Sequence, residues 1–117
     1  MEQNQTVTII NEVRDADVWI LSDTEQNRKT TVWGKATAAQ VAAGESRRAE
    51  LCAPGDGGLY LFRMIDADSF YYSVSEIRLK NGWQLTVSGD ELDGVKVTVA
   101  DENGTVQKEY DAFTARL

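Results

Sequence analysis

Short runs of alternating apolar and polar residues, separated by turn residues, fill most of this chain. In the stretch Val95 to Val99, for example, three valines alternate with Lys96 and Thr98. Because successive side chains of a β-strand point to opposite faces, such a run can bury one face and leave the other in solvent. Clusters of glycine, aspartate and asparagine between the runs are typical of turns. The pattern predicts an all-β fold with little helix.

The run from Asp17 to Leu21 is apolar on both faces, which is typical of a strand that is covered on both sides and central in its sheet. Many short runs, no long helix and no internal repeat favour a two-sheet antiparallel β-sandwich of about seven to nine strands. One short helical turn is expected over Ala36 to Ala43, because alanine favours helix and Gly44 can end one.

Two local features predict how the strands are paired. The apolar alternation in the run Phe70 to Leu79 changes face once, at Ser75 and Glu76. One extra residue in a strand shifts the side-chain parity, so a β-bulge is expected there. The dipeptide Asn81-Gly82 predicts a two-residue hairpin turn.

The length of 117 residues predicts one domain, with enough chain to bury roughly two thirds of its unfolded surface. We expect the core strands over about residues 6–88, followed by an acidic C-terminal hairpin over about residues 94–111. A second domain has no room.

Composition excludes several function classes. The chain has no histidine, which removes the Ser-His-Asp and Cys-His nucleophile systems and every His-ligated metal site. The lone Cys52 cannot form an internal disulfide or a thiolate cage, and its place in an apparent strand indicates a small buried apolar residue. A net charge of −7 disfavours nucleic acid and anionic lipid as partners. No enzymatic activity is expected.

Nothing in the sequence predicts insertion into a membrane. No apolar run approaches the roughly 18 residues of a membrane helix, and Met1 to Gln5 lack the pattern of a signal peptide. The sequence is compatible with a cytosolic protein or with an exported or cell-surface protein whose signal was removed.

Several weak motifs occur in order between Asn11 and Leu79. They are an aromatic-rich strand ending in serine, a Trp-Gly step, a Gly-Glu-Ser segment, and an acidic turn before a last hairpin. In this order the stretch, about two thirds of the chain, resembles small uncharacterised bacterial β-sandwich domains. The residues that carry the resemblance are Val18 to Ser22, Trp33, Gly34, Gly44 to Ser46, Tyr60, Phe62, Asp66, Asp68, Tyr72, Ile77 and Leu79.

The chain departs from that pattern in its alanine-rich segment at residues 36–43, in Asp68-Ser69 where such turns usually carry glycine, and in the acidic hairpin after Ser88. The resemblance implies a fold that often occurs in exported or surface proteins. It implies no known activity.

Two Asp-x-Asp pairs are candidates for a calcium site. Asp15 and Asp17 precede the central run, while Asp66 and Asp68 follow another run, so the pairs could meet at one end of a sandwich. Calcium takes six to eight oxygen ligands, which the acidic loops of C2-like sandwiches supply. The alternative is turn chemistry, because aspartate side chains often accept hydrogen bonds from the backbone two residues on.

Aromatic residues are candidates for binding a sugar ring. Trp33, Tyr71 and Trp83 could stack on carbohydrate if they are exposed on a sheet face. Tyr71 is the most informative of the three, because the alternation places Phe70 and Tyr72 on the inner face of their strand and therefore Tyr71 on the outer face. The alternative is that these rings mostly belong to the core.

Together these observations predict a non-enzymatic binding or structural module, with interaction with another protein as the leading class. An exposed sheet edge or aromatic face would bind the partner. A calcium-dependent C2-like module and a carbohydrate-binding β-sandwich are the alternatives.

Overall fold

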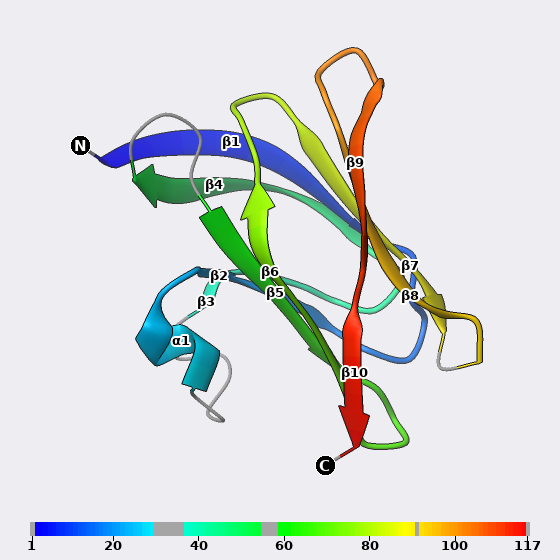
Figure 1. Ribbon diagram of the computed structural model, residues 1–117. Helices are drawn as coiled ribbons and strands as arrows, with labels where there is room; N and C mark the ends of the chain where they lie inside the picture. Colours follow the sequence, from blue (N-terminus) through cyan, green and yellow to red (C-terminus); the bar gives the residue numbers. More distant parts are fainter. Residues whose placement is uncertain (1, 30–36, 55–58, 91, 117) are drawn as a thin grey trace.

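The computed structural model describes residues 2–29, 37–54, 59–90 and 92–116, which form two packed five-stranded sheets (Figure 1). This confirms the predicted all-β sandwich. The first sheet has the order β4 (Ser46–Pro54), β1 (Glu2–Asn11), β7 (Gln84–Asp90), β8 (Gly94–Ala100), β9 (Val106–Asp111). The second sheet has the order β10 (Phe113–Arg116), β6 (Phe70–Arg78), β5 (Leu59–Ile65), β2 (Val18–Ser22), β3 (Thr37–Val41). Neighbouring strands are antiparallel except β1 and β7, which are parallel.

The described strands number ten, more than the seven to nine expected, because β3 and β10 were not predicted. The helical turn predicted over Ala36 to Ala43 is wrong, since Thr37–Val41 is the edge strand β3 and residue 36 lies outside the described residues. Ala39 and Val41 are buried in the core opposite Ile20 and Val18 of β2. The helix propensities of ordinary residue types differ by less than about 1 kcal/mol per residue. Pairing with β2 and burial of Ala39 and Val41 therefore outweigh the preference of alanine for helix.

The one helix in the described ranges is α1 (Glu25–Lys29), which follows β2. The hydroxyl of Thr24 accepts a hydrogen bond from the Asn27 amide and caps its first turn. This five-residue helix is too short to cross a membrane, and the described residues contain no other helix that could.

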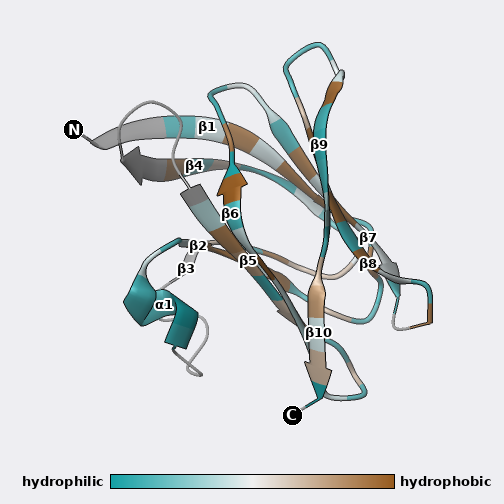
Figure 2. Cartoon of the chain, in the orientation of Figure 1, coloured by the Kyte–Doolittle hydropathy of each residue, from teal (hydrophilic) through white to brown (hydrophobic). Residues whose placement is uncertain are grey.

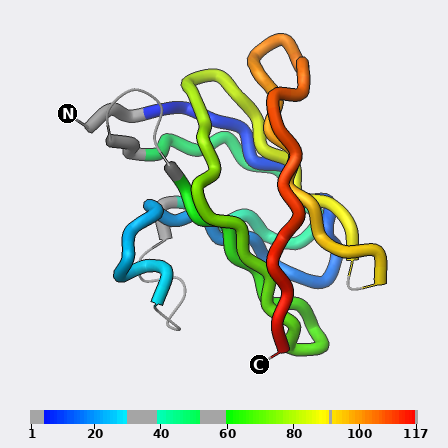
Figure 3. The backbone as a smooth tube through the Cα atoms, in the orientation of Figure 1, coloured from blue at the N-terminus to red at the C-terminus, as the bar shows by residue number. Residues whose placement is uncertain are grey.

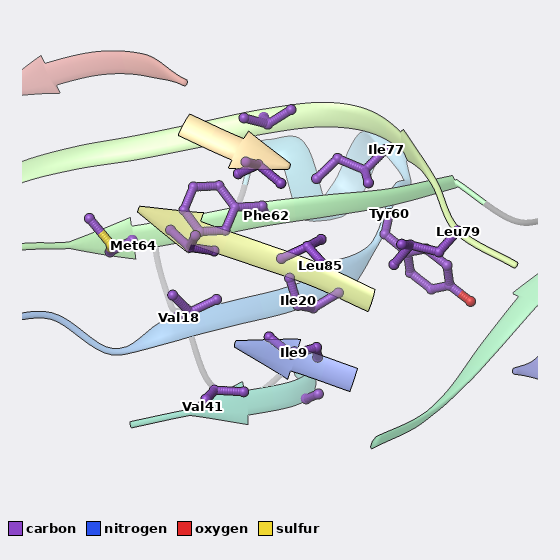
Figure 4. Close-up of a cluster of buried hydrophobic side chains, with 14 of the residues drawn as sticks. Ile9, Val18, Ile20, Val41, Tyr60, Phe62, Met64, Ile77, Leu79 and Leu85 are labelled. Carbon is purple, nitrogen blue, oxygen red and sulfur yellow. The ribbon is translucent and has the colours of Figure 1, made fainter. Parts of the chain in front are cut away.

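Inward-pointing side chains of the two sheets form the core. Ile20 of β2 and Phe62 of β5 meet Ile9 of β1 and Leu85 of β7, and all four are fully buried (Figure 4). Hydropathy follows this division, with apolar residues alternating along the strands and polar residues in the turns (Figure 2). Strand β8 contributes Val95, Val97 and Val99 to the same core, so the acidic hairpin is built into the sandwich.

The predicted β-bulge in β6 is confirmed. Tyr60 of β5 is opposite Ile77, whereas Phe62 is opposite Val74, so one residue of β5 faces both Ser75 and Glu76. Glu76 has a φ of 61°, in the left-handed region. The extra residue lets Val74 and Ile77 face the same core.

The hairpin predicted at Asn81-Gly82 is wrong, because β6 and β7 belong to different sheets. The turn is closed by the Trp83 amide donating to the Lys80 carbonyl, and Gly82 alone has a positive φ, 84°. A hairpin of type I′ needs a positive φ at both central residues, whereas this turn has the form of type II. The Asn81 side chain accepts from the Thr6 amide at 2.8 Å and the Gly82 amide donates to the Thr6 carbonyl, so the turn is bonded to the middle of β1 instead.

The chain passes between the sheets along both long sides of the sandwich. Residues 42–45 lead from β3 to β4, and Ala112 alone separates β9 from β10 (Figure 3). The second crossing makes β10 an edge strand of the second sheet.

Two glycines where β7 and β8 pair differ in the space around them, which predicts different costs for adding a side chain. A Cβ atom on Gly89 would lie 2.0 Å from the Gly94 carbonyl oxygen, whereas a Cβ on Gly94 would meet nothing within 4 Å. Both glycines have a positive φ, 100° and 87°. We expect Gly89→Ala to lower the free energy of unfolding by roughly 3–5 kcal/mol and Gly94→Ala by about 1–2 kcal/mol, measured by urea denaturation. Equal losses would contradict the close approach.

Candidate functional site

A pocket lies at the end of the sandwich where the β1–β2 loop, the β5–β6 turn and the β7–β8 hairpin meet. Its volume is about 230 Å³. Three of the four predicted metal ligands, Asp15, Asp66 and Asp68, line it together with Asp90. The other lining residues are Val13, Met64, Tyr72, Leu92 and Val95. The structure therefore brings most of the predicted acids to one pocket, as the sequence suggested.

Asp66 is buried in this pocket and holds the β5–β6 turn closed. Its Oδ1 atom accepts hydrogen bonds from the amides of Asp68 at 2.9 Å and Phe70 at 3.0 Å. Its Oδ2 atom accepts from the Tyr72 hydroxyl at 2.9 Å. These bonds also stabilise Ser69 at a φ of 66°. This is the turn chemistry that the sequence analysis weighed against metal binding.

Asp17 does not line this pocket. Its Oδ1 atom accepts from the Ala43 amide at 3.0 Å and its Oδ2 atom from the Gln40 side chain at 3.3 Å. It lines a neighbouring shallow depression together with Asp15 and Asp66, and Trp19 and Ile65 line the same depression. Within the described ranges no three acidic or cysteine side chains lie close enough to share a metal ion. Calcium binding stays a prediction.

A second surface covers the outer side of the second sheet. Trp19, Ile65, Tyr71, Phe113 and Ala115 alternate with inward residues of β2, β5, β6 and β10, and we name these five residues the outer aromatic face. Ile65 is opposite Tyr71, and Tyr71 is opposite Ala115. The Phe113 side of this face is the most open, since that residue is 63% exposed.

The Tyr71 and Phe113 rings contact each other on this face. Their centroids are 6.3 Å apart and their planes are inclined by 57°. Tyr71 is half-buried, and it lies on the outer side as the alternation predicted. The two inclined rings, of which Phe113 is the more exposed, therefore form a ridge and no flat platform.

Arg63 lies beside the outer aromatic face, opposite Trp19 and Ser73. Only 7% of its surface is exposed, and its guanidinium donates a hydrogen bond to the Arg28 carbonyl in the last turn of α1. Burial lowers the pKa of Arg63, and the electrostatic influence of Tyr71 opposes that shift. Arg63 thus ties the helix to the sheet.

The other two predicted aromatic ligands do not join this surface. Trp83 is half-buried against the core, with Lys80 Nζ 5.6 Å from the centre of its ring. It follows the end of β6, whereas Tyr71 is near the beginning of that strand. Trp33 lies outside the described residues.

Sequence reasoning missed Phe113, Leu92 and Asp90. Phe113 and Ala115 alternate with Thr114 and Arg116, a period of two that could have predicted β10. Leu92, at the rim of the pocket, is 90% exposed. Only the fold places the β7–β8 hairpin beside the β5–β6 turn, so no local signal marks Leu92 or Asp90.

Comparisons with family models, curated proteins and solved structures find no match to this chain. The resemblance to small bacterial β-sandwich domains stays a prediction from the residues quoted above.

The role of Asp66 can be tested by substitution. Asp66→Ala removes the acceptor of two amides and one hydroxyl, and we expect the free energy of unfolding to fall by roughly 2–4 kcal/mol. Asp68→Ala removes a carboxylate from the same pocket but keeps the Asp68 amide, so its loss should be less than about 1 kcal/mol. Thermal or urea unfolding measures both, and a large loss in the Asp68 variant alone would contradict this role.

The lowered pKa of the Asp23 carboxyl predicts that the stability of the fold depends on pH. Burial raises the pKa of this carboxyl, but hydrogen bonds from Arg28 and from the Glu76 amide, together with the Arg28 charge, lower the pKa below its ordinary value overall. The contribution of this carboxylate is therefore complete above the unfolded pKa of about 3.9 and disappears as the pH falls through the lower folded value.

Asp23→Asn should accordingly be less stable than the unmodified chain at neutral pH, and the difference should shrink in acid. Glu25→Gln, which removes an exposed carboxylate paired with Lys29, is the control and should change stability little at any pH. Urea denaturation across the acid range measures the difference. A stability difference between Asp23→Asn and the unmodified chain that grows in acid would contradict the stabilising role of the Asp23 carboxylate.

Proposed function

We propose that this chain is a non-enzymatic binding module that recognises another protein through the outer aromatic face. The observation that carries the proposal is Phe113, a large apolar side chain that is 63% exposed on an edge strand and rests on Tyr71. Aromatic side chains are enriched in protein interfaces and often supply most of the binding energy. Arg63, Trp19 and Ile65 extend the same face towards α1.

The ring geometry supports a protein partner over a sugar. A sugar ring stacks on the flat face of an aromatic side chain, whereas the Tyr71 and Phe113 planes are inclined by 57° and form no common flat face. A ridge of this kind fits a pocket between side chains of a partner. The lack of histidine and the engagement of Asp66 by three hydrogen bonds support a role without catalysis.

A calcium-dependent module is the second candidate, and the observation that favours it is that Asp15, Asp66, Asp68 and Asp90 line one pocket. Calcium binding would require their side chains to move closer together, because no three of them are placed to share an ion in the described residues. Amide NMR during a calcium titration, with magnesium as the control, separates the two candidates. Saturable, calcium-selective shifts confined to this pocket would support the metal-dependent module. Shifts that are uniform and alike for both ions would leave the acids as turn-forming residues.

The proposal predicts where a partner touches the chain. A photo-cross-linking phenylalanine analogue placed at position 113 should form a discrete protein adduct in the native cell. The same analogue at position 106 is the control, because Val106 is 58% exposed on the edge strand β9 but lies outside the outer aromatic face. Mass spectrometry identifies the adduct.

The partner found in this way is then purified and titrated. Phe113→Ala should weaken its binding at least about tenfold, or ~1.4 kcal/mol, and Val106→Ala should leave the affinity unchanged. Adducts that are equally strong at both positions, or an affinity that is insensitive to Phe113→Ala, would overturn the proposal.

A further inference from the structure

We infer that the partner on this surface is a second copy of the chain, joined edge to edge through β10. The inference rests on the proposed function, because it names the partner that binds at Phe113, where the outer aromatic face reaches the edge of its sheet. In this arrangement the second sheets of the two copies continue into each other across the paired β10 strands, and the two Tyr71–Phe113 ridges lie side by side on the outer surface.

Two edge strands of the first sheet carry positive side chains that oppose such pairing. Arg47 of β4 is opposite Ile9 and therefore on the inner side, and its guanidinium donates to the Gln40 carbonyl of β3 at 3.1 Å. This arginine spans the gap between the edges β4 and β3. Lys108 of β9 shares the inner side with Tyr110, and its Nζ lies 4.9 Å from that ring. Inward-pointing charges on edge strands discourage the addition of another strand.

The edge strand β10 differs from these. Phe113, Thr114 and Ala115 are uncharged, and its one charged residue, Arg116, is the last of the strand. The Arg116 guanidinium lies 5.6 Å from the centre of the Phe70 ring, over its own sheet. The first three residues of β10 are therefore uncharged, and one of them is the exposed Phe113.

The sequence of β10 is complementary to itself. A two-fold axis perpendicular to the sheet must pair residues of the same face, and Phe113 and Ala115 both face outward. An axis through Thr114 places Phe113 opposite Ala115 of the second copy. The symmetry forms this pair of a large ring and a methyl group twice, once with the ring of each copy. Side chains in such pairs have Cβ atoms about 5 Å apart, which suits a phenylalanine beside an alanine. Arg116 then lies opposite Ala112 of the second copy, and no like charges face each other.

Charge and size decide how the association should behave. Each copy carries a net charge of −7, so long-range repulsion opposes the dimer, and salt should strengthen it by screening that repulsion. One short strand pair buries far less than the roughly 1,600 Å² of a standard interface. The dimer should therefore be weak and should form at high protein concentration.

Sedimentation equilibrium at rising protein concentration, in low and high salt, tests the inference with the full chain. The unmodified chain should pass from monomer to dimer, and high salt should increase the dimer fraction. Phe113→Lys should raise the dissociation constant at least about tenfold, although it removes one net negative charge. Val106→Lys makes the same charge change at an exposed position of β9 and should leave the dimer intact. Phe113→Ser repeats the loss of the ring without changing the charge, and circular dichroism confirms that each variant is folded.

The outcomes separate this inference from the proposed function. A chain that stays monomeric at every concentration and salt level would overturn the second copy as partner. The proposed function would then still stand if position 113 cross-links to a different protein, and it would fall with the inference if position 113 forms no adduct. A dimer that salt weakens, or that Val106→Lys abolishes and Phe113→Lys does not, would also overturn pairing through β10.

Discussion

The packing of Ile20 and Phe62 against Ile9 and Leu85 is the interaction on which the rest of the structure depends. These side chains are fully buried between the sheets, and burial of each large apolar side chain contributes roughly 1.5–3 kcal/mol. Their inward orientation determines that the odd-numbered residues of β2 and β5 point outward. The outer aromatic face is thus a consequence of the core, since a shift of one residue in either strand would bury its members.

Irregular positions are stabilised by aspartate side chains that accept backbone hydrogen bonds. Asp23 accepts from the Glu76 amide, which the bulge in β6 leaves without a partner strand residue, and it also binds Arg28 of α1. Asp66 does the same for the turn between β5 and β6. Backbone amides that the strand pairing leaves free need another acceptor, and these carboxylates supply it at the bends that place α1 and the pocket. The acidic composition therefore serves the fold as well as the surface.

Local patterns predicted some elements well and others wrongly, for identifiable reasons. The bulge at Ser75 and Glu76 followed from side-chain parity, which is a property of one strand. The helical turn at residues 36–43 failed because a neighbouring strand, β2, gives alanine and valine a buried β position. The hairpin at Asn81-Gly82 failed because the strands on either side enter different sheets. Of the candidate site residues, Asp15, Asp66 and Asp68 share one pocket, whereas Tyr71 belongs to the outer aromatic face and Trp83, beyond the end of β6, packs against the core.

The sequence by itself determined the fold class, the strands with strong alternation, the face that each of them buries, and the exclusion of histidine chemistry. These are local properties, because hydrophobic periodicity and turn residues act over a few positions of one segment. The tertiary structure alone decided that β1 and β7 are parallel neighbours and that Leu92 lines the same pocket as Asp66. It also decided that Phe113 contacts Tyr71 on an edge strand whose first three residues are uncharged. These pairings join segments far apart in the chain, and they are selected by the total burial of two complete sheets, which no single segment encodes.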